Sequence, residues 1–151
     1  MTSGSPAHCP LTEAAHHRTS AFMMLSFVRD LRDTLLCKTE KGRHMMSLYK
    51  LCSPTLVKVV LLDPRFRTEI LDGLEKLKPA IAGVKKTLEG HSRTYIFTQE
   101  DAQTVSYLLD LSVKRLPRSL AMQMQNLKKD LHLDSMPGKS VTDYLTSVKL
   151  L

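Results

Sequence analysis

Gly138, Lys139 and Ser140 are the residues that most resemble a phosphate-binding motif. They spell the end of a P-loop, in which backbone amides and a lysine hold phosphates while the hydroxyl binds magnesium. That motif also requires a strand and a glycine five residues before Gly138, a position that holds Leu133. We therefore interpret the segment as a turn followed by a helix cap, and we predict no nucleotide or other cofactor.

Four potential zinc ligands, His8, Cys9, His16 and His17, lie within one short segment near the N-terminus. A zinc site needs such ligands to be held in tetrahedral geometry. Adjacent His16 and His17 would point in different directions on a helix, and nothing nearby predicts a rigid frame. A chance cluster is therefore favoured over a metal site, and no metal is predicted.

The remaining histidines are His44, His91 and His132. None has a carboxylate, serine or cysteine at a local spacing that indicates a catalytic triad or a metalloprotease helix. We expect surface or turn positions for them. Because no catalytic motif is found, the sequence predicts a protein that is not an enzyme; an enzyme whose residues converge from distant positions ranks third among the functional hypotheses.

Large flexible apolar side chains could form a protein-binding surface. The chain has eight methionines, whose adaptable shape suits a groove that accepts a partner helix. Ordinary core filling is the competing interpretation, and it is favoured for any individual methionine. The candidate interaction surface consists of Met45, Met46, Met122, Met124, Leu150 and Leu151.

A second candidate surface is basic. The formal net charge is +7 and the pI is about 9.5, with most of the excess from Lys76 onward. Phosphates could be bound there, but aromatic residues make up only 5% and no nucleic-acid-binding signature is found, so a solvated face is favoured. The candidate basic surface consists of Lys85, Lys86, Lys114, Arg115, Arg118, Lys128 and Lys129.

The elements that would position these residues are helical. Residues 1–19 are mostly small and polar and predict a flexible tail, and residues 20–151 predict one helical domain. Apolar residues recur at helical spacing from about Ser20 to Cys37, and a shorter helix is expected around 45–51. Further helix starts are predicted at Pro54, Pro64 and Pro79, after Thr98, near residue 117 and after Ser140.

The fold class predicted from this pattern is all-α, an irregular multi-helix bundle or a short helical solenoid. The irregular spacing of the prolines excludes a repeat of fixed period. Residues 95–97 are expected to form an extended connector whose aromatic side chains enter the core. The predicted core consists of Leu31, Leu35, Val60, Phe66, Ile70, Leu74, Val84, Leu88, Phe97, Leu108, Leu127 and Val148.

The last predicted helix ends on large apolar residues, including Tyr144, Leu145 and Val148, without a polar cap. We expect Leu150 and Leu151 to be docked by a partner or to continue into further sequence. In the second case the helical domain is truncated at its C-terminal end and the chain is a fragment of a larger protein.

Composition also bears on location and function. Three cysteines suit a reducing compartment, and no apolar run of the ~20 residues that span a bilayer is found, so an intracellular protein of the cytoplasm or nucleus is expected. The leading hypothesis is a non-enzymatic helical protein–protein interaction or regulatory module. The alternative is a basic helical domain that binds nucleic acid or an anionic surface.

Overall fold

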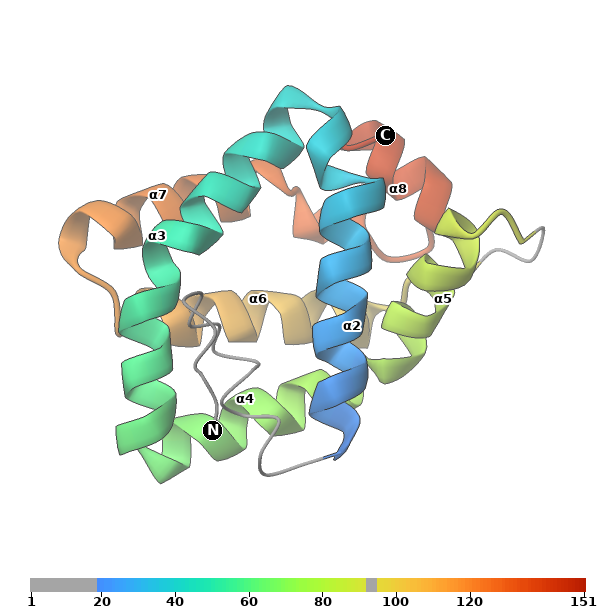
Figure 1. The fold of residues 1–151 in the computed structure, drawn as a ribbon. Coiled ribbons are helices and arrows are strands. Elements are labelled where there is room, and N and C mark those ends of the chain that lie inside the picture. Colours follow the sequence, from blue (N-terminus) through green and yellow to red (C-terminus); the bar gives the residue numbers. More distant parts are fainter. Residues whose placement is uncertain (1–18, 92–94) are drawn as a thin grey trace.

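The computed structural model describes residues 19–91 and 95–151, and within them the fold is all-α, as predicted (Figure 1). Ile96 and Ser140 form an isolated antiparallel bridge, and no strand occurs in the described part. The tail predicted for residues 1–19 lies outside that part except for Thr19. The helices are α2 (Thr19–Thr34), η1 (Leu36–Lys38), α3 (Glu40–Leu62), α4 (Pro64–Lys76), α5 (Lys78–Leu88), α6 (Gln99–Val113), α7 (Arg118–Asp130), η2 (Leu133–Ser135) and α8 (Val141–Ser147).

Helix α3 corrects one prediction, because it continues through Pro54 instead of restarting there. The Ser53 hydroxyl, expected to cap a new helix, instead donates to the Tyr49 carbonyl at 2.8 Å. An interior proline removes one helical hydrogen bond and bends the helix. In Figure 1 the ribbon of α3 accordingly changes direction partway along its length. One bent helix therefore replaces two predicted short ones.

The predicted helix starts at Pro64, after Thr98 and after Ser140 are confirmed by their caps. Helices also begin near Pro79 and residue 117, but without a side-chain cap. Asp63 Oδ1 accepts from the backbone N–H groups of Arg65 and Phe66 at 3.0 and 3.1 Å, with Pro64 in the first turn of α4. Thr98 and Asp101 form a reciprocal capping box at the start of α6. Gly90, two residues after the end of α5, has φ +86°, in the left-handed region that often follows a helix.

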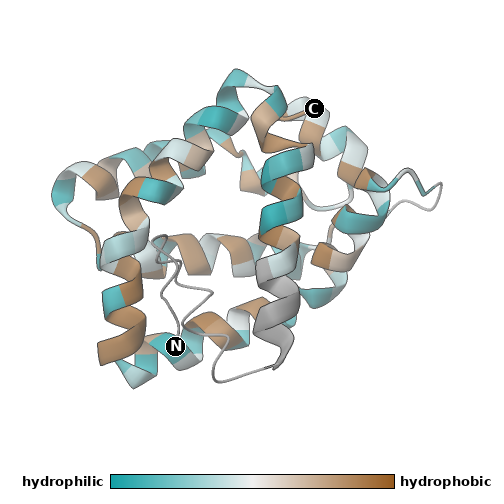
Figure 2. Ribbon diagram, viewed as in Figure 1, coloured by the Kyte–Doolittle hydropathy of each residue, from teal (hydrophilic) through white to brown (hydrophobic). Residues whose placement is uncertain are grey.

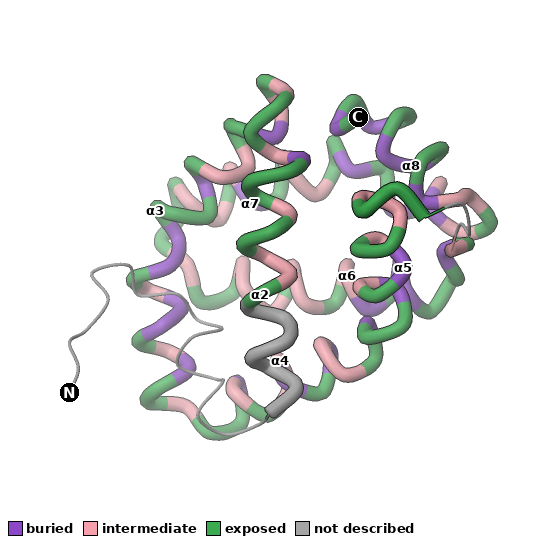
Figure 3. The backbone as a smooth tube through the Cα atoms, turned by 45° about the vertical axis from the view of Figure 1, so that its right-hand side comes forward, coloured by how far each residue is buried: buried purple, intermediate pink, exposed green. Residues whose placement is uncertain are grey.

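Helix α6 lies between the two groups of helices that form the core. It packs against α4 and α7, and α4 packs in turn against α3 (Figure 1). One cluster of buried side chains gathers α5, the 95–97 connector, η2 and α8, and a second gathers α3, α4 and α7. Leu109 and Leu127 contact both clusters, so α6 and α7 make the core continuous. Figure 3 shows buried positions alternating with exposed ones along α3.

The predicted core residues all turn inward, but to different depths. Five of them are buried. Leu108 is partly buried beside Gly73, and the others are partly buried against the same clusters or line a cavity. The buried five are Leu35, Val60, Phe66, Phe97 and Val148. Prediction missed several of the most buried side chains, namely Leu48, Cys52, Val141 and Tyr144.

The C-terminal end differs from the prediction. Helix α8 ends at Ser147, and Lys149 adopts φ +64°. The Leu150 N–H then donates to the Leu145 carbonyl at 2.9 Å, the reversed pattern that satisfies the last carbonyls of a helix. Leu150 is only 4% exposed, so the core of this chain covers it, whereas Leu151 is 54% exposed.

Helix α3 is also long and apolar enough to cross a membrane by length and composition alone. However, 33% of its apolar window is buried inside the structure, where Leu48, Cys52, Leu56 and Val60 belong to the second core cluster. The core helix of a soluble protein meets the same criteria, so we assign no span.

Candidate functional site

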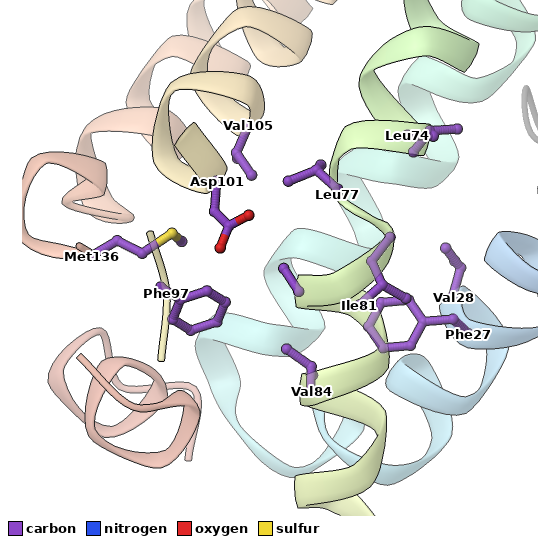
Figure 4. A pocket seen from close by; sticks show the side chains of 11 residues that line it. Phe27, Val28, Leu74, Leu77, Ile81, Val84, Phe97, Asp101, Val105 and Met136 are labelled. Carbon is purple, nitrogen blue, oxygen red and sulfur yellow. The ribbon is translucent and has the colours of Figure 1, made fainter. Parts of the chain in front are cut away.

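An apolar cavity of about 270 Å³ lies between α2, α4, α5 and the start of α6 (Figure 4). One lining residue, Asp101, is polar; every other lining side chain is a hydrocarbon or a thioether. We call it the apolar cavity. Its lining residues are Phe27, Val28, Leu74, Leu77, Ala80, Ile81, Val84, Phe97, Asp101, Val105 and Met136.

The corner between α4 and α5 forms one wall of the cavity. Leu77 is the residue between the two helices, and its N–H donates to the Gly73 carbonyl at 3.1 Å. Pro79 in the first turn of α5 turns the chain sharply, which brings Leu77 and Ala80 to the same wall. Because the Ala80 side chain is a single methyl group, the wall has a recess at this position.

Asp101 forms the polar point on the opposite wall, where Figure 4 shows its carboxylate directed toward the cavity. Asp101 is only 5% exposed. Its Oδ2 accepts from the Tyr95 hydroxyl at 2.7 Å and from the Thr98 N–H at 3.0 Å. Asp101 therefore combines a structural role, capping α6, with a position that places negative charge beside an apolar space.

The connector before α6 holds this arrangement rigid. Burial and the hydrogen bond to Asp101 raise the pKa of Tyr95 to about 12. The Tyr95 and Phe97 rings meet edge-on at 5.8 Å, and Phe97 meets Tyr144 in the same way at 5.5 Å. Burial raises the pKa of Tyr144 to about 12, and its hydroxyl donates to the Leu131 carbonyl at 2.6 Å. The surface of the cavity is apolar, so the cavity is suited to binding an apolar group.

The predicted methionine surface is not assembled in one place. Met124 is buried in the second core cluster, and Met45 packs against the first. Met46 is partly buried, and Met122 is 55% exposed on α7. Met122 lies in a shallow groove along α7 with Arg118, Ser119, Gln123 and Asn126. Of the two terminal leucines in the same set, only Leu151 is exposed.

The predicted basic residues are also divided between sites. Exposed Lys85 and Lys86 lie on α5, on the opposite side of the molecule from the corner that joins α6 to α7 (Figure 1). Exposed Lys114, Arg115 and Arg118 lie at that corner.

Two of these cations have acidic partners. Arg115 Nη1 lies 2.7 Å from Asp63 Oδ2, and the Arg115 guanidinium lies 5.5 Å from the centre of the Phe66 ring. Lys128 Nζ lies 2.7 Å from Asp110 Oδ1 on α6. Lys129 is exposed near the end of α7. The structure does not bring the seven residues of the candidate basic surface onto one surface.

The weaker chemical candidates have local structural explanations. Gly138 turns the chain at φ +84°, and the Ser140 hydroxyl accepts from the Asp143 N–H at 3.1 Å, which confirms a turn and a cap. The histidines in the described part are exposed, as expected: His44, His91 and His132. His8, Cys9, His16 and His17 lie outside the described residues. Within the described part, no group of three or more His, Cys, Asp or Glu is arranged to hold a metal.

Sequence reasoning missed the apolar cavity. Its residues span positions from Phe27 to Met136 and belong to separate elements. The one partial signal was the capping pair of Thr98 and Asp101, which located the carboxylate but not the apolar walls around it.

Comparisons with known proteins give little further direction. No family model matches the chain, and no solved structure matches it. A cell wall-associated protease of Bacillus subtilis (strain 168) is 28% identical over 138 residues, which cover 91% of this chain. The match covers 15% of the length of that protease, so the similarity concerns a small part of it.

Proposed function

We propose that this chain is a non-enzymatic helical interaction module that binds a partner protein by taking an apolar side chain of the partner into the apolar cavity. The observation that carries the proposal is a space of about 270 Å³ with apolar walls from several helices and one carboxylate. Specific binding pockets commonly combine mainly apolar walls with a few placed polar groups.

The size of the cavity suits an aromatic side chain. A cavity of about 150 Å³ with apolar walls is known to bind benzene in another protein, so this larger space fits an indole or phenyl ring. An amphipathic helix offers such an anchor together with neighbours at three- and four-residue spacing. A helix with one aromatic anchor is therefore the partner segment that best matches the cavity.

Asp101 positions one wall of the cavity. Its Oδ2 accepts hydrogen bonds from Tyr95 and Thr98. The surface that the cavity presents is apolar. We therefore expect the partner segment to be recognised through the apolar anchor itself.

The match to part of a cell wall-associated protease does not lead us to propose hydrolysis. The matching segment is a small share of that protein. Among the described residues, the three histidines are exposed and separated along the chain at positions 44, 91 and 132. An interaction module within a larger protein accords with a short match of this kind. Casein hydrolysis by the purified chain would contradict the non-enzymatic part of the proposal.

The test uses Ala80→Leu, which fills the recess, and Ala82→Leu as the matched control. Ala80 is 5% exposed and lines the cavity, whereas Ala82 is exposed on the same helix. Amphipathic helical peptides with one tryptophan are selected from a displayed library, and their affinities are measured by fluorescence anisotropy. Ala80→Leu should weaken binding about tenfold or more, and Ala82→Leu should not.

A folding defect is distinguished from a filled cavity by circular dichroism and melting temperature, which must match those of the control. The neutral fluorescent probe N-phenyl-1-naphthylamine gives a second readout that needs no peptide. It should brighten with the wild type and with Ala82→Leu but not with Ala80→Leu. Equal binding of the probe and the peptides by both folded variants would refute the cavity as the binding site.

A further inference from the structure

The solvent-facing side of α3 lacks acidic residues. From Lys41 to Leu62 the chain contains no aspartate or glutamate, and the only acid of α3 is Glu40 at its first position. Lys50 and Lys58 are exposed, and neither takes part in an ion pair in the described part of the chain. The solvent-facing side of α3 is therefore positively charged from Lys50 to Lys58.

The same side of α3 exposes leucines. Leu51, Leu61 and Leu62 are 58%, 53% and 72% exposed. Leu51, Lys58 and Leu62 are seven and four residues apart, a spacing that places them on one face of a helix. Figure 2 shows hydrophobic colour over the C-terminal part of α3. Leucines and lysines thus share this surface, which we call the α3 face.

The corner where α3 meets α4 extends this surface. Asp63, the acid at the corner, is paired with Arg115, whose hydrogen bond holds the pKa of the Asp63 carboxyl below its usual value. The pair also brings the end of α6 to this corner, and with it exposed Lys114 and Arg118. The leucines at the end of α3 therefore adjoin a corner that holds exposed cations, and the acid at that corner is paired with Arg115.

We propose that the α3 face and its corner dock onto the surface of a bilayer that contains anionic lipids. Leu61 and Leu62 enter the boundary between headgroups and acyl chains, while Lys50, Lys58 and Lys114 reach the lipid phosphates. Lysine suits this position because its long apolar stem can lie along the leucines while its ammonium stays at the phosphates. Binding to a membrane interface gains from buried apolar area and from attraction between basic side chains and anionic lipids, and this surface offers both.

Charge selects this occupant over a second copy of the chain. A two-fold dimer through the α3 face would place Lys50 and Lys58 of one copy against the same face of the other, where α3 has no acid between Lys41 and Leu62. Like charges that face each other are unfavourable, whereas anionic headgroups complement them. The exposed leucines at the corner project from the molecule and suit insertion into a soft surface.

The experiment is flotation of the full chain with vesicles of phosphatidylcholine alone or of equal parts phosphatidylcholine and phosphatidylglycerol. The wild type should float with the anionic vesicles and not with the neutral ones, and less of it should float as salt rises. Leu61→Ser with Leu62→Ser should lower the partition coefficient about tenfold or more. Ile96→Ser with Met122→Ser is the matched control, because these residues are 50% and 55% exposed elsewhere.

Each other outcome overturns the proposal. Equal flotation with neutral and anionic vesicles would show that charge does not contribute to binding. Equal flotation of the leucine variant and the control, both folded by circular dichroism, would show that the α3 face is not the surface that binds the bilayer. Failure of the wild type to float, with capture of an acidic amphipathic peptide under the same conditions, would show that the partner of this face is a protein. The peptide-binding test of the apolar cavity uses other residues, so the two proposals fail independently.

Discussion

Asp101→Ala tests whether the carboxylate beside the cavity stabilises the fold through two hydrogen bonds. The change removes the acceptor for the Thr98 N–H and for the Tyr95 hydroxyl. Losing the Asp101 half of the capping box should cost about 1 kcal/mol, and leaving the tyrosine hydroxyl without its charged partner should cost about 1.5 to 3 kcal/mol. The free energy of unfolding should therefore fall by roughly 2 to 4 kcal/mol.

Tyr95→Phe separates the two contributions. It removes the hydroxyl but leaves Asp101 its bond from Thr98, so it should cost about 1 to 2 kcal/mol. The double variant should cost less than the sum of the single ones, by about 1 to 2 kcal/mol, because both single changes break the same bond. Urea unfolding followed by far-ultraviolet circular dichroism at neutral pH measures all four proteins.

Glu100→Ala is the control, because Glu100 is exposed beside Asp101 in the first turn of α6. It should change the free energy of unfolding by less than about 0.5 kcal/mol. Strict additivity of the Asp101 and Tyr95 changes would show that the 2.7 Å contact contributes nothing to stability. A cost for Glu100→Ala as large as for Asp101→Ala would show that any acid at the helix start has the same effect.

Three further predictions follow from burial, packing and ionisation. Leu48→Ala should lower the free energy of unfolding by about 2 to 5 kcal/mol, whereas Leu51→Ala should change it by less than about 0.5 kcal/mol. The reason is that these leucines are 2% and 58% exposed. Equal costs of the two changes in urea unfolding would refute this placement of α3. Gly83→Ala should lower the melting temperature despite the better helix propensity of alanine, because a Cβ there would collide with the side chain of Tyr95; a higher melting temperature would show that Tyr95 can move aside. Folding raises the pKa of Tyr95 and Tyr144 from 10 to about 12, so the contribution of these two groups to stability should be constant below pH 10 and fall between pH 10 and 12. Tyr144→Phe should make that fall shallower, and an unchanged slope in this variant would contradict the assignment.

Helix starts were predictable where the backbone chemistry is local. Asp63 and Thr98 each cap the helix that follows because a short side chain reaches free N–H groups two or three residues later. Such a signal needs no knowledge of distant contacts. The same reasoning located Ser140 and the turn at Gly138.

Pro54 shows where a local signal is overridden. Ser53 and Pro54 have the same types as a capped start, but buried Leu48, Cys52 and Leu56 lie four residues apart across the proline and pack into one cluster. Burial of that continuous stripe offsets the hydrogen bond that the proline removes. The four-residue spacing was visible in the sequence, and giving it more weight than the proline would have predicted one long helix.

The apolar cavity could not be predicted in the same way, because its shape depends on what is missing from the core. Ala80 leaves a recess through the small size of its side chain, while Phe27 and Met136 are contributed by elements more than a hundred residues apart in the sequence. Each of these residues, taken locally, is an ordinary apolar position of a helix or turn. The proposed binding site depends on their convergence, which follows from the corner between α4 and α5 together with the capping box at the start of α6. Substitution of Ala80 therefore tests the volume of this space, whereas substitution of Asp101 tests the stability of the wall beside it.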